Sequence, residues 1–279
     1  MRYWLKSIVA CMCAVYALVA HADFQADLVK RFPATEGAKV APAFPGFWSV
    51  LKGGEVFFVN DDLSILIPGD VINLKTRHSL ATDIKEAGRP KIDVTTLDVR
   101  DAIKFGNGSH RLYVFDDPDC PYCRHLDGDL SRLHDATIYV FPFPLTSLHP
   151  NAANVAEAIW CQRDRAQAWS DYQRMARDTS TAVTALGAAT ATDPNELEAQ
   201  ARLRLKNAWL AYLHAHRQPD QPTCDNPIDR NLALGQKLNI FGTPALIFAD
   251  GSLIPGAVSA ERIEAQFRKV AMALAGAGK

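Results

Sequence analysis

Two cysteines lie at the point where a strand should give way to a helix, and no other feature constrains the chain as much. Cys120-Pro121-Tyr122-Cys123 follows the apolar run 111–115 and opens an amphipathic stretch that reaches about residue 133. Pro121 suits the first helical turn, because its missing N–H would have no partner there. Unpaired backbone N–H groups and the helix dipole favour a negative sulfur at this end. The pattern therefore predicts a strand, a reactive Cys120 and a helix.

The spacing gives the two thiols different tasks. A thiol attacks a disulfide only as the thiolate, so Cys120 needs a lowered pKa and an open approach. Cys123 lies one helical turn further on, where it can attack a mixed disulfide at Cys120 and resolve it. We expect Cys120 as nucleophile and Cys123 as resolving thiol, both catalytic and joined as a redox-active disulfide when oxidised. Pro121 and Tyr122 should line the motif.

Acidic residues crowd the approach to this motif. Asp116, Asp117 and Asp119 would raise the pKa of a nearby thiol through like charge if they came close to it. We expect them instead in a solvated loop, with Asp119 as the N-cap of the helix. His125, on the helix itself, is expected to face solvent.

The first 22 residues are typical of an export signal. Arg2 and Lys6 precede an apolar stretch from Ile8 to Ala20, and Ala20 and Ala22 are the small residues of a cleavage site. The apolar run is short for a membrane span. We therefore expect a signal peptide that is cleaved after Ala22.

Cleavage would remove two of the six cysteines and leave Cys120, Cys123, Cys161 and Cys224. In an oxidising compartment an even set favours two disulfides, one within the close pair and one between the distant residues. A four-cysteine zinc site is the alternative, although such sites usually have two close pairs. We expect no metal and no organic cofactor.

The charge balance argues against a nucleic-acid partner. The full chain has 30 Lys and Arg against 31 Asp and Glu, and cleavage would remove two basic residues and no acidic one. A near-neutral, slightly acidic chain has no electrostatic footprint for nucleic acid or an anionic membrane surface.

Short β-branched or aromatic runs alternate with turn signals in residues 23–80. A helix over about 25–31 should precede strands at 48–51, 55–59, 65–67 and 70–74. This predicts a small meandering antiparallel sheet, which needs a partner surface because it buries little alone. Residues 81–107 indicate a partly helical linker.

Residues 108–279 predict an α/β order. After the strand, the cysteine motif and its helix, we expect a strand at 137–143, helices at 151–178, 194–216 and 227–238, a hairpin at 245–255 and a closing helix at 260–274. The small-residue stretch 179–192 should separate two of these helices.

Several stretches in combination resemble the DsbC/DsbG family of periplasmic thiol:disulfide interchange proteins. They are Val114–Cys123, Ala158–Cys161, Cys224-Asp225 with Ala233–Gly235, and Phe241–Ala245 followed by Asp250–Gly256. Weaker support comes from residues 47–51, 57–61 and 68–70. Pro121-Tyr122 is similar to the DsbG-like branch, whereas the distant cysteine pair is more similar to DsbC.

The resemblance implies an α+β fold: a small amino-terminal antiparallel dimerisation sheet, a helical linker and a thioredoxin-like catalytic domain. A homodimer in the periplasm would present this domain to misfolded or oxidised exported proteins. A thiol-reductant donor in the membrane would keep it reduced. Thr243 and a cis Pro244 would dock substrate beside Cys120, and Cys161 with Cys224 would form a structural disulfide. The implied activity is that of a thiol:disulfide oxidoreductase and isomerase.

One departure from the family is an enlarged helical insertion around residues 179–216. It could be extra helical cover or an element that binds a partner. Four alternative functions stay open: a DsbG-like sulfenic acid reductase, a net disulfide oxidase, a dimeric holdase chaperone with secondary redox activity, and an assembly factor dedicated to one secretion system.

Overall fold

The computed structural model describes residues 23–75, 77–190 and 193–277. The predicted signal peptide and its cleavage site after Ala22 lie outside the described residues. The chain divides into two compact units, Met1–Pro90 and Lys91–Lys279. Within the described ranges, no helix combines the length and apolar character needed to cross a bilayer.

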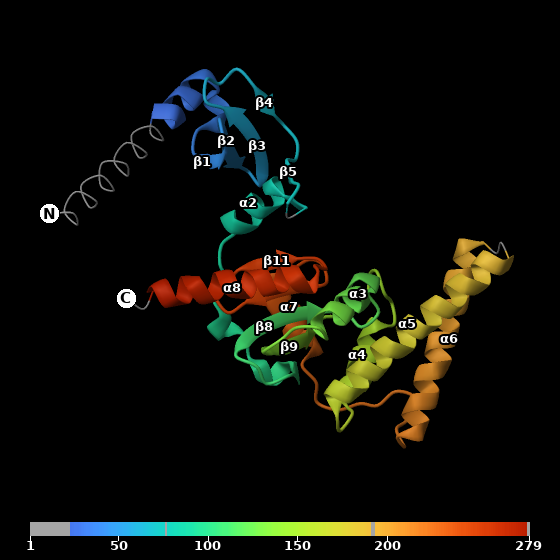
Figure 1. Ribbon diagram of the computed structural model, residues 1–279. Helices are drawn as coiled ribbons and strands as arrows, with labels where there is room; N and C mark the ends of the chain where they lie inside the picture. Colours follow the sequence, from blue (N-terminus) through green and yellow to red (C-terminus); the bar gives the residue numbers. More distant parts are fainter. Residues whose placement is uncertain (1–22, 76, 191–192, 278–279) are drawn as a thin grey trace. The chain divides into compact units, whose positions relative to one another are not determined.

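The first unit is a meandering antiparallel sheet with strand order β1-β2-β3-β4 (Figure 1). Residues 23–31 form the helix before it. The other elements are η1 (Pro33–Thr35), β1 (Lys39–Phe44), β2 (Phe47–Lys52), β3 (Glu55–Asn60), β4 (Leu66–Ile67), β5 (Ile72–Asn73), β6 (His78–Ser79) and α2 (Leu80–Gly88). Phe24 and Leu28 of the first helix pack on Val50 and Val59 in a small core. The predicted antiparallel sheet is therefore confirmed, except that the strand expected at 70–74 is not part of it: β5 pairs with β6 in a separate two-stranded sheet.

Strand β1 was not expected, and a proline lies within it. Pro42 lies within the strand, and Val40 pairs with Val50 of β2. As β1 is at the edge of the sheet, a residue without an N–H costs it little.

The second unit is a mixed five-stranded sheet in the order β11-β10-β8-β9-β7, with helices on both faces (Figure 1). Its elements are η2 (Val94–Thr96), η3 (Val99–Asp101), β7 (Ile103–Phe105), β8 (His110–Asp116), α3 (Pro121–Leu130), β9 (Ala136–Pro142), α4 (Ala152–Trp160), α5 (Arg165–Thr190), α6 (Pro194–Ala215), α7 (Ile228–Lys237), β10 (Ala245–Phe248), β11 (Leu253–Pro255) and α8 (Ala260–Ala277). Strand β8 is parallel to β9 and antiparallel to β10.

Alternation along β8 builds two cores. Leu112 and Val114 point into a core shared with α3, α4, α5, α6 and α8. Tyr113 and Phe115 point to the other face, where α7 packs. Strand β8 is thus buried on both sides up to its carboxyl end, just before the cysteine motif.

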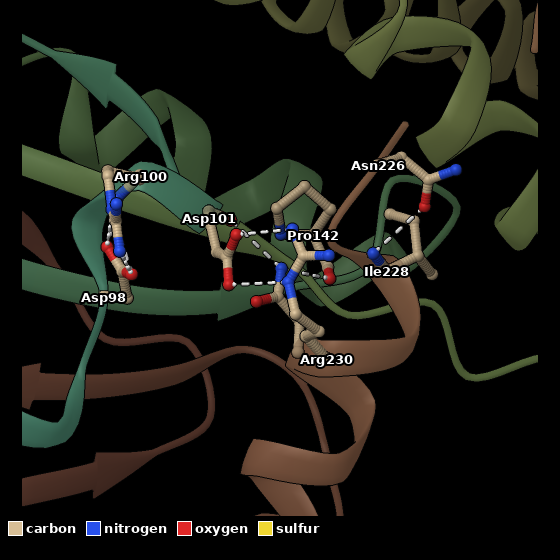
Figure 2. A network of polar contacts seen from close by, with 8 residues as sticks. Asp98, Arg100, Asp101, Pro142, Asn226, Ile228 and Arg230 are labelled. Carbon is tan, nitrogen blue, oxygen red and sulfur yellow. Dashed lines mark hydrogen bonds and ion pairs between the residues drawn. The ribbon is translucent and has the colours of Figure 1, made fainter. Parts of the chain in front are cut away.

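Polar contacts anchor α7 on the second face of the sheet (Figure 2). The Arg230 guanidinium makes two hydrogen bonds to the Asp101 carboxylate, of 3.1 and 2.8 Å. The buried Asn231 amide donates to the carbonyl oxygens of Asp101 and Pro142. These contacts join α7 to η3 and to the end of β9.

Three secondary-structure predictions for the second unit were wrong. Residues 103–105, expected in the linker, form β7 and pair with β9. The helix expected over 151–178 is broken after Trp160: the Asp164 carboxylate caps a new helix by accepting from the Gln167 N–H, and Arg165 stacks on the Trp160 ring at 3.8 Å.

The third error concerns the small-residue stretch, which continues α5 to Thr190 instead of separating two helices. Alanine is the best helix former, and small side chains let α5 and α6 approach closely. A Cβ added at Gly187 would lie 2.3 Å from a methyl carbon of Leu197. The two helices consequently lie side by side as a hairpin (Figure 1).

Candidate active site

Cys120 is the N-cap of α3 and Pro121 is the first residue of that helix. Strand β8 ends at Asp116, and the Cys120 N–H donates to the Asp117 carbonyl at 3.1 Å in the turn between them. The expected place of Cys120 at a strand-to-helix junction is therefore observed. Both thiols are free; Cys120 is 5% exposed and Cys123 is 1% exposed.

The segment 242–244 lies against this junction. The Thr243–Pro244 peptide bond is cis, and the Thr243 carbonyl oxygen is 3.6 Å from the Cys120 sulfur. Sheet pairing explains the proximity, because Ala245 of β10 is the partner of Phe115 in β8. The structure thus brings Cys120, Cys123, Thr243 and Pro244 together.

The environment lowers the pKa of Cys120 to about 5 from its ordinary value of 9.0. The largest cause is a hydrogen bond from the Cys123 thiol, and the backbone N–H groups of Cys123 and Tyr122 add to it. Partial burial opposes the shift. The helix start therefore holds a thiolate at neutral pH, as the position of Cys120 predicts.

Cys123 shows the opposite behaviour. Burial raises its pKa far above the ordinary value, and the hydrogen bond that it gives to Cys120 raises it further. The charges of Asp116 and Cys120 act in the same direction. At neutral pH the pair thus consists of one thiolate and one thiol.

The acidic loop before the motif differs from the prediction. Asp116 and Asp117 are 3% and 0% exposed, not solvated, and Cys120 rather than Asp119 is the N-cap of α3. The carboxylates of Asp116 and Asp117 are therefore buried within the turn between β8 and α3. The Asp117 carboxylate accepts hydrogen bonds from the Asp119 and Leu145 N–H groups and from His149 Nδ1, at 2.8, 2.7 and 2.9 Å.

Asp116 lies beside Cys123 at the end of β8. Burial raises the pKa of its carboxyl well above the ordinary range, while the hydrogen bond with Cys123 lowers it. Among the described residues, the Asp116 Oδ1 atom has no hydrogen-bond partner. Such a carboxyl can hold or accept a proton next to the buried thiol.

Helix α5 supports the loop from the other side. The Tyr172 hydroxyl donates to the Asp119 carboxylate, and the Gln173 amide donates to the Pro118 carbonyl at 3.1 Å. Burial raises the pKa of both Asp119 and Tyr172. Sequence reasoning missed Tyr172, Gln173 and His149, because nothing local links them to a motif that lies more than 25 residues earlier in the chain.

Three large apolar side chains are exposed on segments that adjoin the site. Tyr122, within the motif, is 71% exposed; Phe241 and Leu148 are 77% and 66% exposed. Phe241 is two residues before Thr243, and Leu148 is next to His149, which binds Asp117. Pro121 is also exposed, and so is His125, as expected.

Cys161 and Cys224 form a disulfide with a Cα–Cα distance of 5.7 Å. It joins the end of α4 to the segment before α7 and so encloses the α5–α6 hairpin. Their sulfurs are therefore not available as thiolate ligands of a four-cysteine zinc site.

Comparison with known proteins assigns this architecture to a family. The family model described as a thioredoxin-like domain matches residues 103–271. The chain belongs to the thioredoxin-like family. Its thioredoxin-like domain accordingly begins at β7.

Similar proteins narrow the assignment. The probable thiol:disulfide interchange protein DsbC of Bordetella pertussis is 26% identical over 250 residues, which are 88% of this chain and 75% of that protein. The DsbC of Escherichia coli is 22% identical over 257 residues, covering 88% and 87%. A solved disulfide interchange protein from Neisseria gonorrhoeae is 30% identical, with a TM-score of 0.44, covering 62% of this chain and 97% of that one. The thioredoxin-like domain and the similarity to these two DsbC proteins make the chain a thiol:disulfide oxidoreductase or isomerase.

Proposed function

We propose that this chain is a periplasmic disulfide isomerase and reductase that corrects disulfides in exported proteins. The observation that carries the proposal is the opposite pKa shift of two adjacent thiols, with Cys120 lowered to about 5 and Cys123 raised. Cys120 is then the nucleophile and Cys123 the resolving thiol.

The first step is attack by the Cys120 thiolate on a substrate disulfide. A bond forms between the Cys120 sulfur and one substrate sulfur, and the other substrate sulfur leaves as a thiolate. In isomerisation this freed thiolate attacks elsewhere in the substrate, and a substrate thiolate finally displaces Cys120. No net electron transfer occurs in that cycle.

Reduction of the substrate takes the second route. Cys123 loses its proton and attacks the Cys120 sulfur, which releases the second substrate thiolate and leaves the enzyme oxidised by two electrons. We assign the proton to Asp116, whose carboxyl lies beside Cys123 in a buried site. A thiol donor, for which we propose a membrane protein, must then reduce the Cys120–Cys123 disulfide.

The segment that contains Thr243 and the cis Pro244 docks the substrate. Thr243 offers its backbone next to the Cys120 sulfur, and Pro244 fixes its direction. The exposed apolar side chains of Tyr122, Phe241 and Leu148 suit the apolar segments that misfolded chains expose.

We further propose a homodimer formed through residues 23–80, joined by residues 81–102 to the thioredoxin-like catalytic domain that begins at β7. Ile65, Leu66, Ile72 and Leu74 of the first unit are 48–87% exposed. Strand β4 is a two-residue edge strand, which a second copy can extend. Burial of these side chains in a dimer would supply the partner surface that a small sheet needs.

A net oxidase is the second candidate, and a specific observation favours it. A low pKa of Cys120 stabilises the reduced form, which makes the disulfide form a stronger oxidant. Trapping the thiols in cells distinguishes the two: an isomerase or reductase is recovered mainly reduced at Cys120 and Cys123, and an oxidase mainly oxidised.

The proposal is tested by refolding a secreted protein with scrambled disulfides. We expect Cys120→Ser to abolish recovery of its activity, and Cys123→Ser to retain part of it, since the isomerisation route needs only the first thiol. Arg202→Gln, on the exposed face of α6, is the matched control. Full recovery with Cys120→Ser would contradict the proposal.

A further inference from the structure

A polar groove of about 530 Å³ begins at Pro121, the residue after the nucleophile. It runs between α3 and α5, the helix that carries the insertion. It is lined by Pro121, Arg124, His125, Gly128, Asp129, Arg132, Arg177, Ser180 and Thr181. The unexpected continuation of α5 beyond residue 178 supplies the last two.

Basic side chains dominate this lining. Arg124, His125 and Arg132 come from α3, and Arg177 faces them from α5. Each guanidinium has five N–H donors in a fork that suits carboxylates. A groove of this composition attracts a negatively charged group.

One carboxylate lines the groove, that of Asp129, and a second, that of Asp127, reaches Arg177 from outside the lining. Arg177 Nη1 is 2.7 Å from Asp127 Oδ2, and Arg132 pairs with Asp129, whose carboxylate also accepts from the Ala260 N–H. Each pair uses only part of its guanidinium, and the Arg132 and Arg177 side chains stay 60% and 43% exposed.

Arg124 and His125 are the other two basic residues that line the groove. The Arg124 guanidinium donates to the Asp119 carbonyl oxygen at 3.1 Å, and its charge also acts on the carboxyl of Asp119. His125 is exposed beside it. The residues that line the groove carry three guanidinium groups and one carboxylate, that of Asp129, while the carboxylates of Asp127 and Glu261 interact with Arg177 and Arg132 from outside the lining.

We infer that this groove binds acidic side chains of the polypeptide substrate, a few residues from the cysteine that Cys120 attacks. An extended chain advances about 3.3 Å per residue, so Asp or Glu two to four positions away reaches the arginines while the sulfur is at Cys120. The inference rests on the proposed function and adds a substrate preference to it.

The test uses three disulfide-linked peptides that differ only in the residues two to four positions after the cysteine: acidic, uncharged or basic. The reduced full-length protein reacts with each, and kcat/KM is measured. Two arginine–carboxylate contacts at exposed sites predict that the acidic peptide reacts about five-fold faster than the basic one. This ratio should fall toward one in about 500 mM salt.

The double variant Arg132→Gln, Arg177→Gln should lose the preference, whereas Arg174→Gln, which removes a charge from the outer side of α5, should keep it. The salt series on the unaltered protein needs no variant and so covers a folding failure. Equal rates for the three peptides with the unaltered protein would overturn the inference and leave the proposed function standing. No reaction with any peptide would instead contradict the proposed function.

Discussion

The low pKa of Cys120 makes a quantitative prediction about rate against pH. With a pKa of about 5 instead of 9.0, the thiol is about 99% ionised at pH 7 rather than about 1%, a gain of about 100-fold in thiolate. Nucleophilicity falls as the pKa falls, with a Brønsted slope of about 0.4–0.5, so four units remove about 40- to 100-fold. The two effects nearly cancel at pH 7.

At acidic pH, Cys120 should react faster than an ordinary thiol. At about pH 5.5 the ordinary thiol is almost wholly protonated while Cys120 is still mostly ionised, so Cys120 should react tens of times faster. The assay is the rate of reaction of the reduced protein with a small aliphatic disulfide from about pH 4 to 9, with glutathione as reference. We expect a curve that is flat above pH 6 and has its midpoint near 5.

The Cys123→Ala variant tests, in the same assay, whether the Cys123 thiol causes the low pKa of Cys120. Because the Cys123 thiol is the largest cause of the low pKa, its removal should move the midpoint upward, while the backbone N–H donors keep it below that of glutathione. A wild-type rate that climbs tenfold per pH unit to pH 8 would refute this reasoning.

Three further changes test the surroundings of the site. Replacing Cys161 and Cys224 by Ala reopens a 63-residue loop and should lower the free energy of unfolding by about 4 kcal/mol in denaturant titrations. Asp116→Asn should leave the first attack unchanged and slow the release by Cys123, seen as accumulated mixed disulfide in rapid acid quench. Since burial raises the Asp116 pKa, this change should also stabilise the fold at about pH 8 and not at about pH 3, as urea titrations at both pH values would show. Trp209→Ala removes a buried ring packed edge-on against Tyr172 and should cost about 3–5 kcal/mol, measured by thermal and urea unfolding.

Local sequence patterns were sufficient to predict the strand and the helix on either side of the cysteine motif. An apolar run, a proline after a cysteine and an amphipathic stretch each favour one conformation, and together they placed Cys120 at the start of α3. The antiparallel sheet of the first unit followed in the same way from turn residues between short strands. These features depend on neighbours in sequence.

What the sequence could not give depends on neighbours in space. Asp116 and Asp117 belong to a polar run that is typical of a solvated loop. In the structure, Leu145 and His149, which follow β9 in the chain, form hydrogen bonds with the Asp117 carboxylate. Tyr172 does the same for Asp119. Such converging partners stabilise a buried carboxylate in its charged form, and a single sequence does not show that convergence.

The two wrong predictions about the bounds of α5 could have been avoided from the local sequence. Asp164 followed three residues later by Gln167 is a capping pattern, and it marks the start of α5 within what looked like one helix. The alanine-rich stretch after residue 179 favours helix by propensity alone. In both cases the signal lies in individual residues, a capping pair and a run of strong helix formers.

The role of Cys120 is tested most directly by trapping its covalent intermediate. Reduced Cys123→Ala protein is mixed with a disulfide-linked peptide, quenched in acid, digested and mapped by mass spectrometry, beside the Cys120→Ala variant. The account predicts one peptide per chain, attached at Cys120, and no adduct with the Cys120→Ala variant. An adduct that forms equally well without Cys120 would contradict it.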